Sequence, residues 1–129
     1  MSVESGKALF WAPRILSILL ILLLSVFALD VFDEHLGFWR TMAAVAMHLI
    51  PSIVLVTALI VAWRREWVGT VLYAAAGLLY VLWASFRPLT VPLPVRLLWM
   101  LTLAAPAFVI AGLFLFNWKK HDELRALLQ

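Results

Sequence analysis

No part of the sequence limits the possible folds more than residues 41–63, which run for 23 positions without a charged side chain. About 20 apolar residues in a helix suffice to cross the hydrocarbon core of a bilayer. Three further uncharged runs lie at 15–29, 67–86 and 97–118. With 66% hydrophobic residues, a chain of 129 residues has more apolar surface than a soluble domain of this size can bury. The sequence therefore predicts an all-α, integral membrane four-helix bundle that forms one domain over residues 1–129.

The basic residues predict how the spans are oriented. We expect a cytoplasmic tail at 119–129 and spans at about 11–32, 41–63, 67–86 and 97–118, the first of them with Arg14 extended toward the headgroups. Four spans put both termini on one side, and seven of the ten basic residues fall there: Lys7, Arg14, Arg64, Arg65, Lys119, Lys120 and Arg125. Because cytoplasmic loops are enriched in Lys and Arg, we expect both termini in the cytoplasm. The seven tryptophans lie near the ends of the spans, as expected for residues that favour the interface.

The connections between spans follow from their lengths and prolines. Only three residues, 64–66, join the second and third spans, which must therefore be antiparallel neighbours. Residues 87–96 contain three prolines, and we expect an extended loop there. Pro13 suits the first turn of a helix, and Pro106 should disturb the fourth span. The leucines of the tail have helical spacing, which favours a short surface helix.

Several polar residues fall at similar depth near the outer ends of the spans. From the rise of a helix, His48 lies about 10 Å and Tyr80 about 9 Å inside the outer ends of their spans. Ser52 follows His48 by one turn, and Asp30 projects from the first span slightly above them. We therefore predict an outer-leaflet polar pocket, because ionisable residues inside a membrane are costly and are usually functional. Its residues are Asp30, His48, Ser52, Tyr80 and Arg87.

Three hypotheses remain open for His48. It packs one helix against another by a hydrogen bond, it belongs to a ligand or proton pocket, or it faces a partner protein. Asp30, Asp33, Glu34 and His35 are candidates for a weak external metal site, but adjacent acids at a helix end are more often simply solvated. A haem held by two histidines needs a second histidine at the depth of His48, and neither His35 nor His121 is so placed. We expect no metal, no cofactor and no catalytic residues.

Four sequence elements resemble a family of small bacterial four-span membrane proteins of unknown function. They are FALDVF (27–32), FW (38–39), MHLIPS (47–52) and AWRREWVGTVLY (62–73). The resemblance covers most of the first three spans and implies the four-span fold but no activity. The positions that it singles out are Phe27, Asp30, His48, Pro51, Trp63, Arg64, Glu66, Trp67 and Gly69. From the residues themselves, Trp63 and Trp67 flank the tight turn, and we expect Glu66 to pair with Arg64 or Arg65.

The function class follows from what such a small bundle offers. Little of the chain lies outside the bilayer, and no catalytic triad, phosphate loop or pair of carboxylates is present. We therefore expect a non-enzymatic, multi-pass protein of the bacterial inner membrane, an interaction or accessory subunit that binds a membrane protein or a second copy of itself. The alternative is a small transporter, or a ligand or pH sensor, that uses the pocket around His48. Nucleic acid is not an expected partner, because the basic residues lie at the span ends.

Overall fold

The computed structural model describes residues 1–86 and 90–129, apart from the side chain of Glu34. In this part of the chain, the regular secondary structure is entirely helical. Four helical segments, 3–33, 38–64, 66–85 and 93–119, are long and apolar enough to cross a membrane. The prediction of four such helices is therefore confirmed. In chain order the elements are α1 (Val3–Val26), η1 (Asp30–Glu34), α2 (Phe38–Arg64), α3 (Glu66–Ser85), α4 (Leu93–Trp99), η2 (Met100–Ala104), α5 (Ala105–Lys119) and α6 (His121–Leu128).

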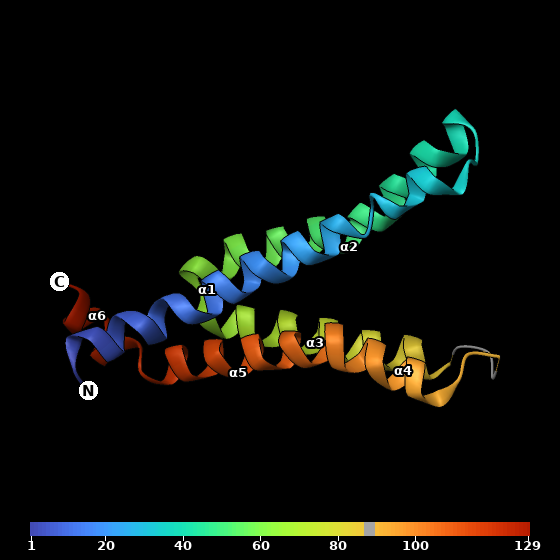
Figure 1. Cartoon of the computed structure of the whole chain (residues 1–129). Coiled ribbons are helices and arrows are strands. Elements are labelled where there is room, and N and C mark those ends of the chain that lie inside the picture. The colour runs from blue at the N-terminus through green and yellow to red at the C-terminus, as the bar shows by residue number, and fades with distance from the viewer. Residues whose placement is uncertain (87–89) are drawn as a thin grey trace.

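The helices form two antiparallel pairs that are close at one end and separate toward the other (Figure 1). One pair is α1 with α2, and the other is α3 with α5, which is continued by η2 and α4. Both chain termini and α6 lie where the pairs are close, which we call the terminal end (Figure 1). We call the opposite end, with η1 and α4, the open end. The arrangement leaves the four helices packed together over only part of their length.

The apolar core occupies the half of the bundle nearer the terminal end. Leu20, Leu55, Ile110 and Phe114 are buried there, one or two from each of α1, α2 and α5. Tyr73 of α3 is fully buried, and its hydroxyl donates a hydrogen bond to the carbonyl of Leu55 at 3.4 Å. This close packing and the hydrogen bond from Tyr73 join α1, α2, α3 and α5 in this half of the bundle.

The first helix begins earlier than the sequence predicts. It starts at Val3 rather than near residue 11, and the hydroxyl of Ser2 accepts a hydrogen bond from the Ser5 amide at 3.2 Å. Such capping satisfies an amide that has no partner within the helix. Pro13 therefore lies inside α1 and not in its first turn. At the open end, a 3₁₀ turn and Gly37, with φ of +82°, lead into α2.

The proline-rich segment before the fourth span also differs from the expectation. Instead of an extended loop to residue 96, a helix begins at Leu93, with Pro94 in its first turn, where proline leaves no backbone hydrogen bond unmade. Further along, the helix widens into a π-helical turn, Met100–Ala104, and Pro106 follows directly in the first turn of α5. Proline has no amide hydrogen and clashes with the preceding turn, which accounts for the local change. The tail forms the helix α6, which packs on α1.

Candidate functional site

An open cavity of about 750 Å³ lies between the two helix pairs at the open end. We call it the open-end cleft. All four long helical segments contribute to its walls, which are lined by Leu24, Phe27, Asp30, Ala44, Met47, His48, Pro51, Tyr80, Trp83, Trp99 and Leu103. Mostly apolar walls with a few polar groups, and a volume within about 300–1,000 Å³, are typical of small-molecule sites in proteins.

Three of the five residues predicted for the outer pocket line this cleft. Asp30 begins η1, His48 lies in α2, and Tyr80 lies in α3. The ring of Tyr80 packs against that of Trp83, with 5.5 Å between centroids, so these two residues form an aromatic wall. Arg87 lies outside the described residues. The structure thus places an acid, an imidazole and a phenol from three helical segments around one hollow.

Ser52 was predicted to line the outer pocket, but it does not belong to the cleft. Its side chain is buried, and its hydroxyl accepts a hydrogen bond at 3.1 Å from Ser25 of α1. Four residues of an α-helix turn through about 400°, so Ser52 is rotated by about 40° from the face of His48. That rotation carries it from the cleft into the contact between α1 and α2, where it joins the two helices.

The hydrogen bond of His48 determines what its ring offers to the cleft. The atom Nδ1 lies 2.8 Å from the carbonyl oxygen of Ala44 in the same helix. Because a carbonyl can only accept, Nδ1 must carry the proton. In the neutral ring, Nε2 is then an acceptor. This bond stays within α2, so it does not join two helices as the packing hypothesis for His48 requires.

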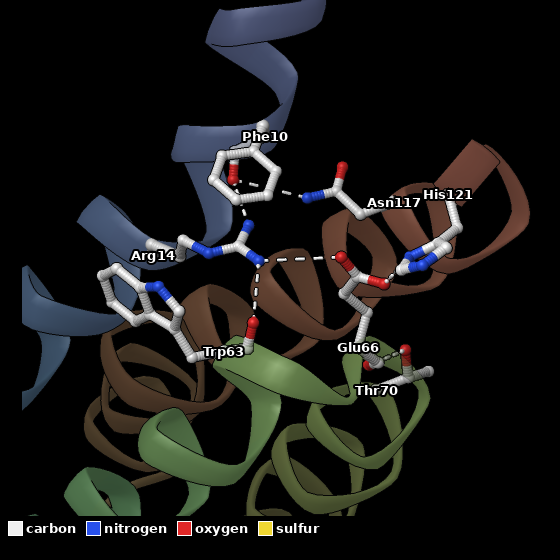
Figure 2. A network of polar contacts seen from close by, with 7 residues as sticks. All are labelled: Phe10, Arg14, Trp63, Glu66, Thr70, Asn117 and His121. Atoms are coloured by element: carbon white, nitrogen blue, oxygen red, sulfur yellow. Dashed lines mark hydrogen bonds and ion pairs between the residues drawn. The ribbon is translucent and has the colours of Figure 1, made fainter. Parts of the chain in front are cut away.

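A second polar cluster lies at the terminal end, and sequence reasoning did not find it. We call it the terminal network (Figure 2). Arg14 of α1 is fully buried; its guanidinium lies 3.6 Å from a carboxylate oxygen of Glu66 and donates to the carbonyls of Phe10 and Trp63. The other carboxylate oxygen of Glu66 lies 2.7 Å from Nδ1 of His121, the first residue of α6. The network therefore joins α1, the turn between α2 and α3, and the tail helix.

Two side chains complete the terminal network and correct the expected pairing. Asn117 of α5 donates to the carbonyl of Phe10 at 3.4 Å, and the hydroxyl of Thr70 donates to the carbonyl of Glu66 (Figure 2). Glu66 was expected to pair with Arg64 or Arg65, but both arginines are exposed. The carboxylate of Glu66 instead extends to Arg14, whose side chain does not reach outward to headgroups as expected.

The remaining residues singled out by the sequence lie around these two sites. Trp63 and Trp67 are both partly exposed beside the tight turn, and the Trp63 ring meets that of Trp11 edge to face, with centroids 5.8 Å apart. Pro51 lines the cleft, and Gly69 is buried against Ala62 and Phe114. Within the described residues, no three His, Asp or Glu side chains are grouped closely enough to hold a metal ion. The side chain of Glu34, which was a candidate for the weak external metal site, lies outside the part that the structure describes.

The tail helix carries an ion pair that should respond to pH. Lys120 donates to Glu123 at 2.9 Å and lowers the pKa of that carboxyl below its ordinary value of 4.5. Because the pKa of Glu123 is lower in the folded state, the ion pair stabilises the fold fully at pH values above the pKa of the unfolded chain. This stabilisation is lost as the pH falls through the pKa of the folded state. We expect α6 to loosen below about pH 4.5, seen as reduced amide protection in hydrogen exchange. The Glu123→Gln variant, which cannot form this ion pair, is the control, and an identical pH profile in both proteins would contradict the prediction.

These features define an all-α protein with four helices that are long and apolar enough to cross a membrane and with an open cleft between two helix pairs. The chain belongs to the family described as a domain of unknown function (DUF7670), which matches residues 2–125. No curated protein matches the chain. No solved structure matches it either.

Proposed function

We propose that this chain is a non-enzymatic protein of the bacterial inner membrane that spans the bilayer four times and binds an amphipathic small molecule in the open-end cleft. Large aliphatic side chains on every span support insertion, because they are more than half exposed: Leu22 (56%), Ile53 (61%), Leu79 (66%) and Leu101 (69%). Such side chains are stable in contact with lipid tails and costly in water.

The charges support an orientation with both termini in the cytoplasm. The terminal end of the bundle carries seven of the ten basic residues, whereas Arg40 and Arg96 belong to the open end. The positive-inside tendency then places the open-end cleft in the outer half of the membrane. In this orientation, Asp30 and His48 face a cavity that is reached from the outer leaflet or the external medium.

The convergence of Asp30, His48 and Tyr80 on one cleft is the observation that carries the proposal. A transport path would need to continue to the terminal end. Between the cleft and the terminal network, however, each helix places an apolar or aromatic residue in the core: Leu20, Leu55, Tyr73 and Ile110. The arrangement therefore favours binding or sensing from one side over passage through the bundle.

The test is native mass spectrometry of the protein extracted gently from its own membrane. We expect a small adduct on the wild-type chain that is absent from His48→Leu, at an unchanged melting temperature, because His48 bonds only to its own helix among the described residues. His35→Asn is the control, since His35 is exposed, lies outside the cleft lining and has a left-handed backbone that Asn tolerates. An adduct that persists in His48→Leu, or a wild-type chain without one, would contradict the proposal.

An accessory subunit is the second candidate function. It is favoured by large aromatic side chains at the open end that contact little of this chain: Phe38 (68% exposed), Trp39 (82%) and Phe86 (84%). Aromatic residues are enriched in the cores of protein interfaces. The same mass spectra decide this question, because a subunit would carry the mass of another chain or of a second copy, and a bare monomer would count against it.

A further inference from the structure

A second hollow, of about 410 Å³, lies between α1 and the segment formed by η2 and α5. We call it the α1–α5 groove. Every lining residue is apolar, among them Leu16, Leu19, Leu20 and Leu23 on one wall and Leu101 and Ala105 on the other. The small side chain of Ala105, next to Pro106 and the π-helical turn, leaves the space opposite the leucines unfilled.

The groove and the open-end cleft follow each other along the same helices. On α1, Leu20 and Leu23 line the groove. Four residues further on in each case, Leu24 of α1 and Phe27, which directly follows α1, line the cleft. Residues four apart lie on one face of a helix, one turn above the other. On the opposite wall, Leu101 lines the groove and Leu103, in the same π-helical turn, lines the cleft. The two hollows thus adjoin along α1 and η2, with the cleft nearer the open end and the groove nearer the terminal end.

The charge of the cleft indicates which head group fits it. Among the described residues that line it, Asp30 is the one acid, and none is a lysine or an arginine. In its neutral form His48 offers an acceptor at Nε2, because its bond to Ala44 keeps the proton on Nδ1. Tyr80 and Trp83 also line the cleft, and aromatic rings attract cations. A primary ammonium group complements all three features, because it is positively charged and donates hydrogen bonds.

We infer that the open-end cleft binds the ammonium head of a long-chain amphiphile, with the head at Asp30 and His48 and the hydrocarbon chain in the α1–α5 groove. This inference rests on the proposed function and names its ligand class. The bilayer interior is as apolar as the groove, so the chain gains little free energy by moving from one to the other. The head group therefore determines affinity, and the groove determines which way the chain lies.

The experiment uses the full-length protein in phosphatidylcholine nanodiscs with hexadecylamine that carries a photoreactive diazirine in its chain. We expect saturable cross-linking to peptides that contain residues 16–23 and 101–109. Unlabelled hexadecylamine should compete, whereas hexadecanoate and the hexadecyltrimethylammonium ion should compete about tenfold less well, since one lacks the positive charge and the other lacks N–H donors. Phosphatidylethanolamine added to the nanodiscs distinguishes the sources: displacement of the probe indicates a bilayer aminophospholipid, and no displacement indicates a free amine.

Variants separate the head site from the groove. Asp30→Asn should weaken binding about tenfold, which corresponds to ~1.4 kcal/mol, because it replaces a charged hydrogen-bond acceptor with a neutral amide. Leu19→Trp and Ala105→Phe fill the groove and should abolish cross-linking to the groove peptides, while Leu79→Trp and Ala75→Phe, the same changes at exposed positions of α3, should not. Leu19 is itself half exposed, so its variant should fold even where Ala105→Phe does not.

Two results would overturn the inference, and each bears differently on the cleft. If the amine binds and responds to Asp30→Asn but cross-links elsewhere, the chain does not lie in the groove, and the cleft remains a binding site. If hexadecylamine does not bind saturably, or binds no better than its two analogues, the head group is not an ammonium. The proposed function is then decided separately, by the adduct that is lost in His48→Leu.

Discussion

Replacing Glu66 with leucine should lower the free energy of unfolding by about 3–5 kcal/mol, because removing one partner of a buried ion pair leaves the other charge uncompensated. The group left behind is the guanidinium of Arg14, which is fully buried and lies 3.6 Å from the carboxylate. Its cation also lies 3.6 Å from the centroid of the Phe10 ring, a contact too weak to replace a carboxylate. Reversible unfolding in detergent measures the difference.

The chain offers a close control for this prediction. Glu4 occupies the first turn of α1 as Glu66 occupies the first turn of α3, but Glu4 is exposed. Glu4→Leu removes the same interaction with a helix N-terminus, which contributes about 0.3–1 kcal/mol. The double variant Arg14→Leu with Glu66→Leu should recover most of the lost stability, because buried ion pairs can often be replaced by apolar residues at little net cost. Equal effects of Glu66→Leu and Glu4→Leu would show that the ion pair does not hold the terminal end together.

Gly69→Ala and Gly112→Ala should change stability in opposite directions. A Cβ atom at Gly69 would lie 2.6 Å from the Cβ of Ala62 and 3.0 Å from the Phe114 ring. Since the Cβ of Ala62 is fixed to its backbone, α2 and α3 must move apart, and overpacking of this kind costs about 1–3 kcal/mol. At Gly112 a Cβ meets nothing within 4 Å, so alanine should stabilise the helix by up to about 1 kcal/mol.

Melting temperatures of the two alanine variants, measured in one detergent, test this pair of predictions. Gly77→Ala is an intermediate case, because its Cβ would lie 3.1 Å from the ring of Phe108, and that side chain is partly exposed and can move. A stabilised Gly69→Ala variant would contradict the prediction, because it would show that α2 and α3 leave room for a Cβ atom at this contact.

The sequence predicts the four helices and part of the cleft because these depend on local pattern and on length. The uncharged runs determine which segments can cross a bilayer as helices. The short link at 64–66 makes the second and third of these helices antiparallel neighbours. Depth along a helix needs only the rise per residue, which is why His48 and Tyr80 could be expected at one level. Asp30, placed slightly above them, lines the same cleft.

Features that depend on helix rotation or on distant partners could not be predicted. Ser52 is displaced from the cleft by a rotation of about 40°, which is smaller than the uncertainty of a helix phase estimated from composition. Glu66 had two arginines beside it in the sequence, yet its partners are Arg14 and His121, from opposite ends of the chain. The residues around Glu66 in the sequence do not indicate whether its ion-pair partner is adjacent in the chain or far from it. The early start of α1 was obscured by the charges of Glu4 and Lys7, which a helix outside the apolar run can carry.

The two helix pairs are fixed to each other at the terminal end and separate at the open end, and this has a mechanical consequence. The helix α2 has 27 residues and is therefore about 40 Å long. A rotation of about 5° at its fixed end would displace its far end by about 3.5 Å over that length. The two helix pairs can thus rotate relative to each other about the contact between Arg14 and Glu66. Closure of the open end on a small molecule would therefore need only a small rotation at the terminal end, beside the tail helix α6.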